Sequence, residues 1–258
     1  MISPPAVPSD PPRRLRHNIV TRFVLAAAAA AILGSVMSGC STGTGTSTST
    51  STQGTSTATP PSQPPRSTAP SLPTAAQLKS ALLSSGDLGT GFATESTGSG
   101  TSSVTGCQGI ADLLNGTARN RQTEQETSLA AGQTGPFVDE VLMTEPAQAL
   151  SQDYARDQTT LTTCRTLAVS DGSTTISLAL SPIHFGGPGA TSVQLDGTLD
   201  GVEVNGYITV DRLGSVELGL IYFQIASGSS QLASYYVTLA VAKARSALGP
   251  LASPLATS

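Results

Sequence analysis

Glu124 and Glu126 are the side chains in this 258-residue sequence that come nearest to a catalytic pair. Alternate residues of a strand share one face, so the two carboxylates would lie side by side, as acid/base cleavage of a glycan requires. Acidic residues are far more often the solvated face of a strand. A carboxylate-based glycan hydrolase is therefore an alternative and not the main expectation.

The other polar residues argue against catalysis. His184 is the only histidine after residue 39, which removes arrangements that need two histidines. At the end of an expected strand, it is predicted to be a partly packed structural residue. Lys79 and Lys243 fall on solvated positions of expected helices, and the sequence contains no nucleophile elbow, zinc-protease, P-loop or dinucleotide-binding motif. We expect no enzyme and no cofactor.

The remaining acidic residues do not form a metal site. Asp153 and Asp157 flank Arg156 on an expected helix and are interpreted as surface charge. Residues 196–201 resemble the first half of a calcium loop, but its twelfth position is Tyr207, which cannot supply a bidentate carboxylate. No metal ligand is predicted, and calcium binding at this loop is a minor alternative.

The N-terminus has the order of a secretory signal. Four arginines precede an uncharged run over 23–37, and two small residues then lead to Cys40. As a helix at about 1.5 Å per residue, this run would reach about 22 Å, short of the roughly 30 Å hydrocarbon core. A permanent transmembrane helix is therefore disfavoured, and residues 1–39 are predicted to be a cleaved signal peptide.

The residues from Met37 to Cys40 resemble the bacterial lipobox. In that motif the cysteine thiol carries diacylglycerol, and the new N-terminus usually receives a further acyl chain such as palmitate. Two or more chains hold a protein stably at a membrane. We therefore predict lipidation at Cys40 and a place on the extracytoplasmic face of the cell membrane. Arg13-Arg14 leaves both the general and the twin-arginine export routes open.

The segment 40–73 is predicted to be a disordered tether, because it consists almost wholly of Ser, Thr, Gly, Pro and Gln. Removing residues 1–39 leaves nine basic and 16 acidic residues, a formal net charge of −7. This charge argues against a nucleic-acid partner and gives no basic patch for anionic headgroups. The expected membrane contact is therefore the covalent lipid.

Residues 74–249 have the pattern of one folded domain, followed by a flexible tail over 250–258. The first half predicts a helix from Thr74, capped by Thr74 and Gln77 and ending near Gly86, and an irregular loop over 94–105. A helix is expected after Cys107. Two strands over 121–131 and 136–143 follow, and a helix from Pro146 to Cys164 presents one apolar face.

The second half is richer in strands. They are expected around 176–180, 190–195, 202–210 and 216–226, with a turn over 211–214. The strand over 202–210 alternates as though one face were solvated, whereas 216–226 is apolar on both faces, as a covered central strand would be. A last helix runs from Ser229 to Gly249. The predicted class is α+β, one antiparallel sheet packed by helices.

Cys107 and Cys164 are the cysteines that remain once Cys40 carries lipid. In an oxidising compartment two cysteines are expected to pair, which would close a loop of about 58 residues. Two free buried thiols are the alternative.

A family resemblance follows from this order of features. The lipobox, the tether, residues 82–88 before Gly91-Phe92, Cys107 and a helix that ends at Cys164 resemble actinobacterial lipoproteins with a sensor-like domain. That domain is related to the extracytoplasmic domain of PknH-type serine/threonine protein kinases. The resemblance covers about 74–249 and implies an α/β domain with a cleft.

One main expectation for the function and two alternatives therefore remain. The main expectation is a membrane-anchored, non-catalytic binding or sensor-like domain that captures a small envelope ligand between helices and sheet. The first alternative is the glycan hydrolase with Glu124 and Glu126. The second is a structural partner of another envelope protein.

Overall fold

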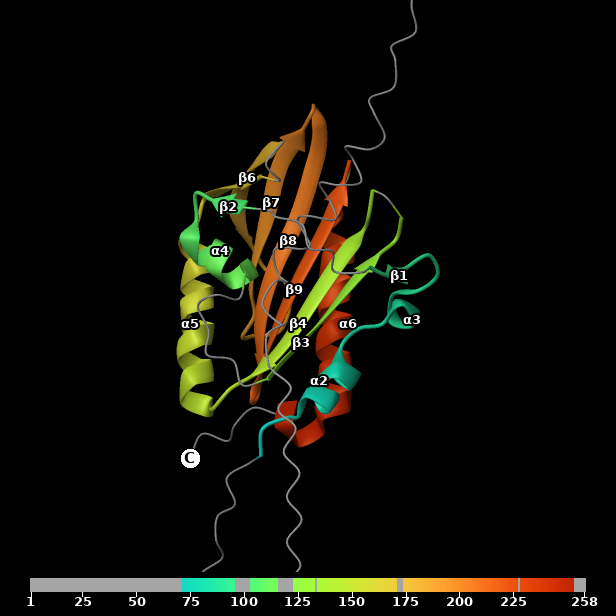
Figure 1. The fold of residues 1–258 in the computed structure, drawn as a ribbon, viewed down its shortest axis with the longest axis vertical. Coiled ribbons are helices and arrows are strands. Elements are labelled where there is room, and N and C mark those ends of the chain that lie inside the picture. The colour runs from blue at the N-terminus through green and yellow to red at the C-terminus, as the bar shows by residue number, and fades with distance from the viewer. Residues whose placement is uncertain are drawn as a thin grey trace, which may run out of the picture. The chain divides into compact units, whose positions relative to one another are not determined.

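The computed structural model describes residues 71–95, 103–115, 123–132, 134–170, 174–226 and 228–252. The predicted signal peptide, Cys40 and the tether up to residue 70 lie outside these ranges. Within them, helices pack on both faces of one twisted sheet, which confirms the predicted α+β class (Figure 1).

Nine antiparallel strands form the sheet, in the order β1-β3-β4-β9-β8-β7-β6-β5-β2. The strands β3 and β4 pair with each other, and from β5 to β9 each strand pairs with the next one along the chain. Hairpins therefore build most of the sheet. The strands are β1 Ala93–Thr94, β2 Ser103–Thr105, β3 Thr123–Ala130, β4 Phe137–Thr144, β5 Thr166–Ser170, β6 Thr175–Ile183, β7 Thr191–Leu199, β8 Val202–Leu213 and β9 Val216–Ile225.

Two helical layers cover the sheet. We name its two sides the α5 face, which α4 and α5 cover, and the α6 face, which α2 and α6 cover (Figure 1). The helices are α2 Ala75–Ala81, α3 Ser85–Leu88, α4 Gln108–Asn115, α5 Ala147–Thr163 and α6 Ser230–Leu248, followed by the 3₁₀ turn η1 Gly249–Ala252. In the described part of the chain, none of these helices is both long and apolar enough to cross a membrane.

Each face has its own core, because alternate residues of a strand point to opposite sides. In β9, Phe223 and Ile225 belong to the core of the α5 face, whereas Leu218, Leu220 and Tyr222 belong to that of the α6 face. The prediction of a central strand that is apolar on both faces is therefore confirmed for β9, although Gly219 and Ile221 on the α5 face are only partly buried.

The expected solvated face of β8 holds at Glu203, which is exposed, and in part at Asn205, but it is wrong for the second half of the strand. Tyr207 and Thr209 are 3% and 0% exposed, because α6 lies over this side of the strand and packs Val237 into the same core. At these two positions the alternation comes from hydroxyl-bearing residues that are buried under α6, and not from residues exposed to solvent. The strand also continues through Asp211 to Leu213, beyond the predicted turn.

Several local predictions need correction near the N-terminus. The capping box of Thr74 and Gln77 is present, with the Thr74 N–H donating to Gln77 Oε1 at 2.9 Å. However, α2 ends at Ala81, because Leu82 is extended, and a second short helix, α3, follows. The expected irregular loop over 94–105 contains the short strands β1 and β2, and β5 was not predicted at all.

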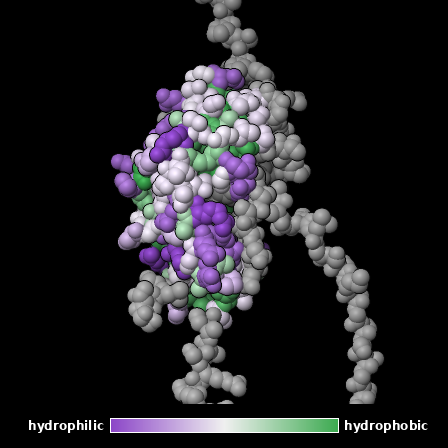
Figure 2. All heavy atoms as spheres, turned by 90° about the vertical axis from the view of Figure 1, so that its left-hand side faces the viewer, coloured by the Kyte–Doolittle hydropathy of each residue, from purple (hydrophilic) through white to green (hydrophobic). Residues whose placement is uncertain are grey.

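The helix α5 has the predicted apolar side, with Leu150, Tyr154 and Leu161 buried. Asp153 and Asp157 are 8% and 4% exposed, so their interpretation as surface charge is wrong. They lie on the sheet-facing side beside the apolar residues. Figure 2 shows the opposite, outward side of α5, where hydrophilic residues gather.

A disulfide and a terminal turn close the domain. Cys107, just before α4, and Cys164, at the end of α5, form the predicted disulfide, with their Cα atoms 6.0 Å apart. At the C-terminus, η1 extends the described domain past Gly249, and Leu251 accepts a hydrogen bond from the Ser215 N–H at 3.0 Å.

Candidate functional site

Two consecutive acidic residues of β4 are buried in the sheet. Asp139 is 6% and Glu140 is 0% exposed, and as neighbours in a strand they point to opposite faces. Burial raises the pKa of each to about 8, because the low-dielectric surroundings disfavour the charged form. Both carboxyls therefore hold a proton at neutral pH. Their surroundings differ, and so do their roles.

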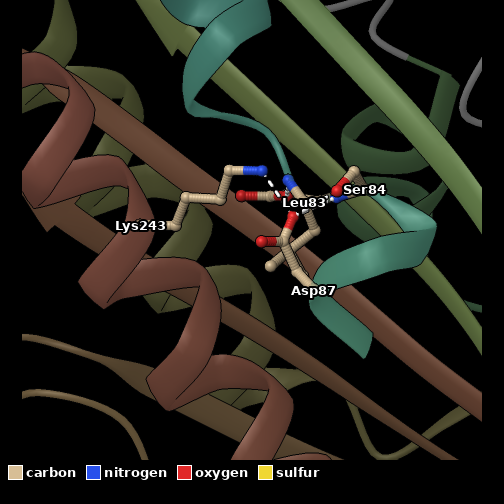
Figure 3. Close-up of polar contacts among 5 residues, drawn as sticks. Leu83, Ser84, Asp87 and Lys243 are labelled. Atoms are coloured by element: carbon tan, nitrogen blue, oxygen red, sulfur yellow. Dashed lines mark hydrogen bonds and ion pairs between the residues drawn. The ribbon is translucent and has the colours of Figure 1, made fainter. Parts of the chain in front are cut away.

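Glu140 holds the segment of α2 and α3 to the α6 face. Figure 3 shows Leu83, Ser84 and Asp87 of this segment beside Lys243 of α6. Glu140 Oε2 accepts a hydrogen bond from the Leu83 N–H at 2.6 Å. Next to it, Asp87 Oδ2 accepts from the Ser84 N–H at 2.7 Å and from Lys243 Nζ at 2.5 Å. The ion pair joins α3 to α6, so Lys243 is not the solvated residue that the sequence predicts.

This arrangement explains the segment 82–88 that contributed to the family resemblance. Ser84 and Asp87 form the capping box of α3, and Leu82 and Leu83 are buried. These residues fasten α2 and α3 to the sheet. They stabilise this part of the fold.

Asp139 lies on the α5 face, where it is the direct cross-strand partner of Ser128 in β3. A hydrogen bond from the Ser128 side chain lowers the pKa of Asp139, and the nearby Glu126 carboxylate raises it further, but burial dominates. Glu126 pairs with Val141, so it is the diagonal neighbour of Asp139 at about 7–8 Å between Cα atoms. Ser128 is buried and Glu126 is exposed, so this acidic group extends from the core to the surface.

The neighbouring strands provide an apolar floor. Val141 pairs with Gly219 of β9, and Asp139 pairs with Ile221, all on the α5 face. Val141, Gly219 and Ile221 are only partly buried, although β4 and β9 are interior strands of the sheet. A Cβ built on Gly219 would meet no described atom within 4 Å. Within the described ranges, no atom therefore fills the space directly above Gly219.

We call this set the Asp139 site: the polar Glu126, Ser128 and Asp139, and the apolar Val141, Gly219 and Ile221. The helix α5 contacts β7, β8 and β9 and so lies on one side of it. Small-molecule sites typically combine an apolar lining with a few polar groups that fix orientation. The Asp139 site has this composition.

The sequence predicted part of this site. Glu124 and Glu126 do share one face of a strand, and Glu124 pairs across it with Met143. Sequence reasoning missed Asp139, although an acidic pair inside the apolar strand 137–144 was a usable signal.

His184 is exposed just after β6, which corrects its interpretation as a partly packed residue.

The chemistry open to the Asp139 site is acid/base or ionic. A protonated Asp139 donates a hydrogen bond or a proton, and the ionised form pairs with a cation. Among the described residues, no group of three or more His, Cys, Asp or Glu side chains is placed to hold a metal ion. At the calcium-like loop, Asp196 Oδ1 instead accepts from Gln194 Nε2 at 2.8 Å and Asn205 Nδ2 at 2.9 Å.

Comparison with known proteins bears on the fold. No protein-family model matches the sequence, and no curated protein matches it. Among solved structures, the extracellular domain of PknH from Mycobacterium tuberculosis matches with a TM-score of 0.55 and 14% identity. The match covers 69% of this chain and 98% of that chain. The two proteins share a fold.

This likeness agrees with the resemblance noted in the sequence. It extends over nearly the whole of the PknH extracellular domain, so the shared part is the complete fold and not a fragment of it. At 14% identity it establishes the architecture and leaves the chemistry of the site to this chain's own residues.

Proposed function

We propose that the folded domain is a non-catalytic, sensor-like binding module on the extracytoplasmic face of the membrane, anchored by a lipid on Cys40. The observation that carries this proposal is the fold, which matches 98% of an extracellular domain. The signal-like N-terminus, the lipobox-like residues before Cys40 and the disulfide support the same compartment.

The Asp139 site is the proposed place of binding. Interior strands normally have both faces covered, yet β4 and β9 leave Val141, Gly219 and Ile221 partly exposed on the α5 face. A buried carboxyl borders this floor. A ligand that covers the floor would complete the burial of the sheet.

Anchoring is tested by the Cys40→Ala variant in the native host, with Ser41→Ala as the matched control. The wild type and Ser41→Ala should enter the detergent phase on Triton X-114 partitioning, with an intact mass raised by the lipid. Cys40→Ala should lose both properties. Partitioning of Cys40→Ala like the wild type would contradict the proposed anchor.

Binding is tested by native mass spectrometry of the mature protein purified from membranes. A co-purified small molecule supports the binding module. Its absence, together with a stable complex recovered after cross-linking in cells, would instead support a structural role beside another envelope protein.

Glycan hydrolysis is the second candidate, favoured by one observation. Asp139, with its pKa raised to about 8, lies diagonally across from the Glu126 carboxylate, as an acid and a base would. Release of soluble fragments from purified cell-wall glycan, abolished by Glu126→Gln and retained by Glu124→Gln, would establish this activity. Absence of release by the wild type would reject it.

A further inference from the structure

The charge of the mature chain is unevenly distributed over the fold. None of its 16 acidic residues lies in α2, α6 or η1, whereas these elements hold three of its nine basic residues, Lys79, Lys243 and Arg245. The helix α2 and the turn η1 both pack against α6, so we call the three elements the α6 layer (Figure 1). The total charge of −7 therefore does not describe this side of the molecule.

Two of the three cations are available to a partner. Lys243 is engaged by Asp87 of α3, which offsets its charge. Lys79 and Arg245 are exposed, and within the described ranges neither forms an ion pair. Burial raises the pKa of Asp211 and the nearby charge of Arg245 lowers it, but Asp211 is 2% exposed. The surface therefore presents the arginine and not the acid.

The outward side of α6 is uncharged apart from its cations. Its exposed residues recur every three or four positions, as one stripe of a helix does, and include Gln231, Tyr235, Thr238, Ala242, Arg245 and Ser246. Tyr235 is 55% exposed, and in the part of the chain that the structure describes it is the only exposed large hydrophobic side chain. Leu232 and Leu239 lie partly buried on the same helix. An apolar stripe edged by cations is typical of helices that lie on membranes.

The proposed lipid lies within reach of this layer. The described domain begins at residue 71, just before α2, and Cys40 precedes it by about thirty residues. At no more than about 3.6 Å per residue, the intervening chain reaches about 110 Å at most. A lipid on Cys40 would therefore keep the domain at a high local concentration beside the bilayer, where a weak contact suffices.

We propose that the α6 layer lies on the outer leaflet of an anionic bilayer, with the Tyr235 ring at the level of the headgroups and Lys79 and Arg245 beside lipid phosphates. This inference rests on the proposed anchoring and names the surface that meets the membrane. Tyrosine suits this depth because its ring is apolar and its hydroxyl is polar. The α5 face, with the Asp139 site, is then turned away from the membrane.

Vesicle co-flotation of the lipid-free mature chain, Cys40→Ala, measures this contact apart from the anchor. Vesicles of phosphatidylglycerol and phosphatidylcholine in equal parts provide the anionic surface, and pure phosphatidylcholine is the neutral comparison. At about 0.1 M salt the Debye length is about 10 Å, which screens acids on the far side of the domain. The chain should bind the anionic vesicles at least about tenfold tighter, since each exposed cation contributes about fivefold.

Three variants at exposed positions locate the contact. Lys79→Gln and Arg245→Gln should each weaken binding to anionic vesicles about fivefold, and Tyr235→Ala about threefold or more. Their melting temperatures should stay at the value of the parent chain, because these side chains are exposed. Arg165→Gln is the matched control: it removes an exposed arginine next to the end of α5, and should change binding less than about twofold.

Several results would overturn the proposal. They are equal binding to both kinds of vesicle, equal losses in Arg245→Gln and Arg165→Gln, and unchanged binding in Tyr235→Ala. Self-association that Tyr235→Ala abolishes, without vesicle binding, would assign the α6 layer to a second copy of the chain.

The contact and the anchor fail separately. A lipid-free chain that does not bind anionic vesicles, beside a wild type that still enters the detergent phase, would remove the contact and keep the lipid on Cys40. A lipid-free chain that binds as described, beside a wild type without lipid, would support the contact and remove the anchor.

Discussion

The Glu140→Gln variant should make the protein more stable at alkaline pH. Burial raises the folded-state pKa of Glu140 from 4.5 to about 8. Below pH 4.5 the carboxyl is protonated in both folded and unfolded states and has no pH effect. As the pH rises from 4.5 to about 8, the unfolded state gives up its proton and the folded state keeps it, so the wild type loses stability throughout this window.

The structure sets the size of the effect. The window spans about 3.5 pH units, and each unit corresponds to about 1.4 kcal/mol, which gives a ceiling of about 5 kcal/mol. Relaxation and water entry around an ionised Glu140 reduce this, so we expect Glu140→Gln to exceed the wild type by about 2–4 kcal/mol at pH 9. At pH 4.5 the two should agree within about 1 kcal/mol, because Gln keeps the oxygen that accepts from the Leu83 N–H.

Urea unfolding followed by circular dichroism from pH 4.5 to pH 9 measures this difference. The exposed Glu203→Gln variant is the control, and its curve should follow the wild type at every pH. Asp139 titrates in both proteins and cancels from the comparison with Glu140→Gln. A constant difference between wild type and Glu140→Gln across the range would refute the reasoning.

Three further changes test the packing. Asp87→Asn should destabilise the domain by about 1 kcal/mol at pH 7, because the variant loses the helix cap and the ion pair with Lys243. This cost should vanish in acid, since those bonds lower the pKa of Asp87 and are lost when it is protonated. An unchanged cost at pH 2 in urea titrations would contradict this. Replacing Cys107 and Cys164 by Ser should cost about 4 kcal/mol in guanidinium unfolding, and a cost below about 1 kcal/mol would speak against a stabilising disulfide. Gly197→Val should lower the free energy of unfolding by about 2 kcal/mol or more, since its Cβ would lie 2.6 Å from a backbone oxygen of β6. Gly219→Val should keep or raise the melting temperature, because no described atom lies within 4 Å of its Cβ. Equal melting temperatures for the two variants would contradict the packing described.

Local patterns in the sequence predicted the elements that depend on near neighbours. The strands β3, β4 and β9 and the helix α6 follow from apolar periodicity within a few positions. The strand β5 has only five residues, and β1 has two, so neither carries enough periodicity to be recognised.

Burial of polar residues was harder to predict, because it depends on what packs across the sheet. Thr209 and Asp157 both occupy positions that alternation or charge assigns to solvent. The first is covered by α6 and the second lies on the sheet-facing side of α5, contacts that come from distant parts of the chain.

The same reason explains the partial prediction of the site. The sequence shows that Glu124 and Glu126 share a face, since that needs only the two-residue period of a strand. It does not show that Asp139 lies diagonal to Glu126, because the register of β3 on β4 follows from the whole hairpin. It also cannot show that Gly219 of β9 lies beside them, with no described atom within 4 Å of where its Cβ would be.

The most direct test of the binding function is native mass spectrometry of the mature protein and its Gly219→Val variant, purified in parallel from the same envelopes. The account predicts a small molecule bound to the wild type and absent from a folded Gly219→Val protein. A bound molecule retained equally by both proteins, or none on the wild type, would contradict it.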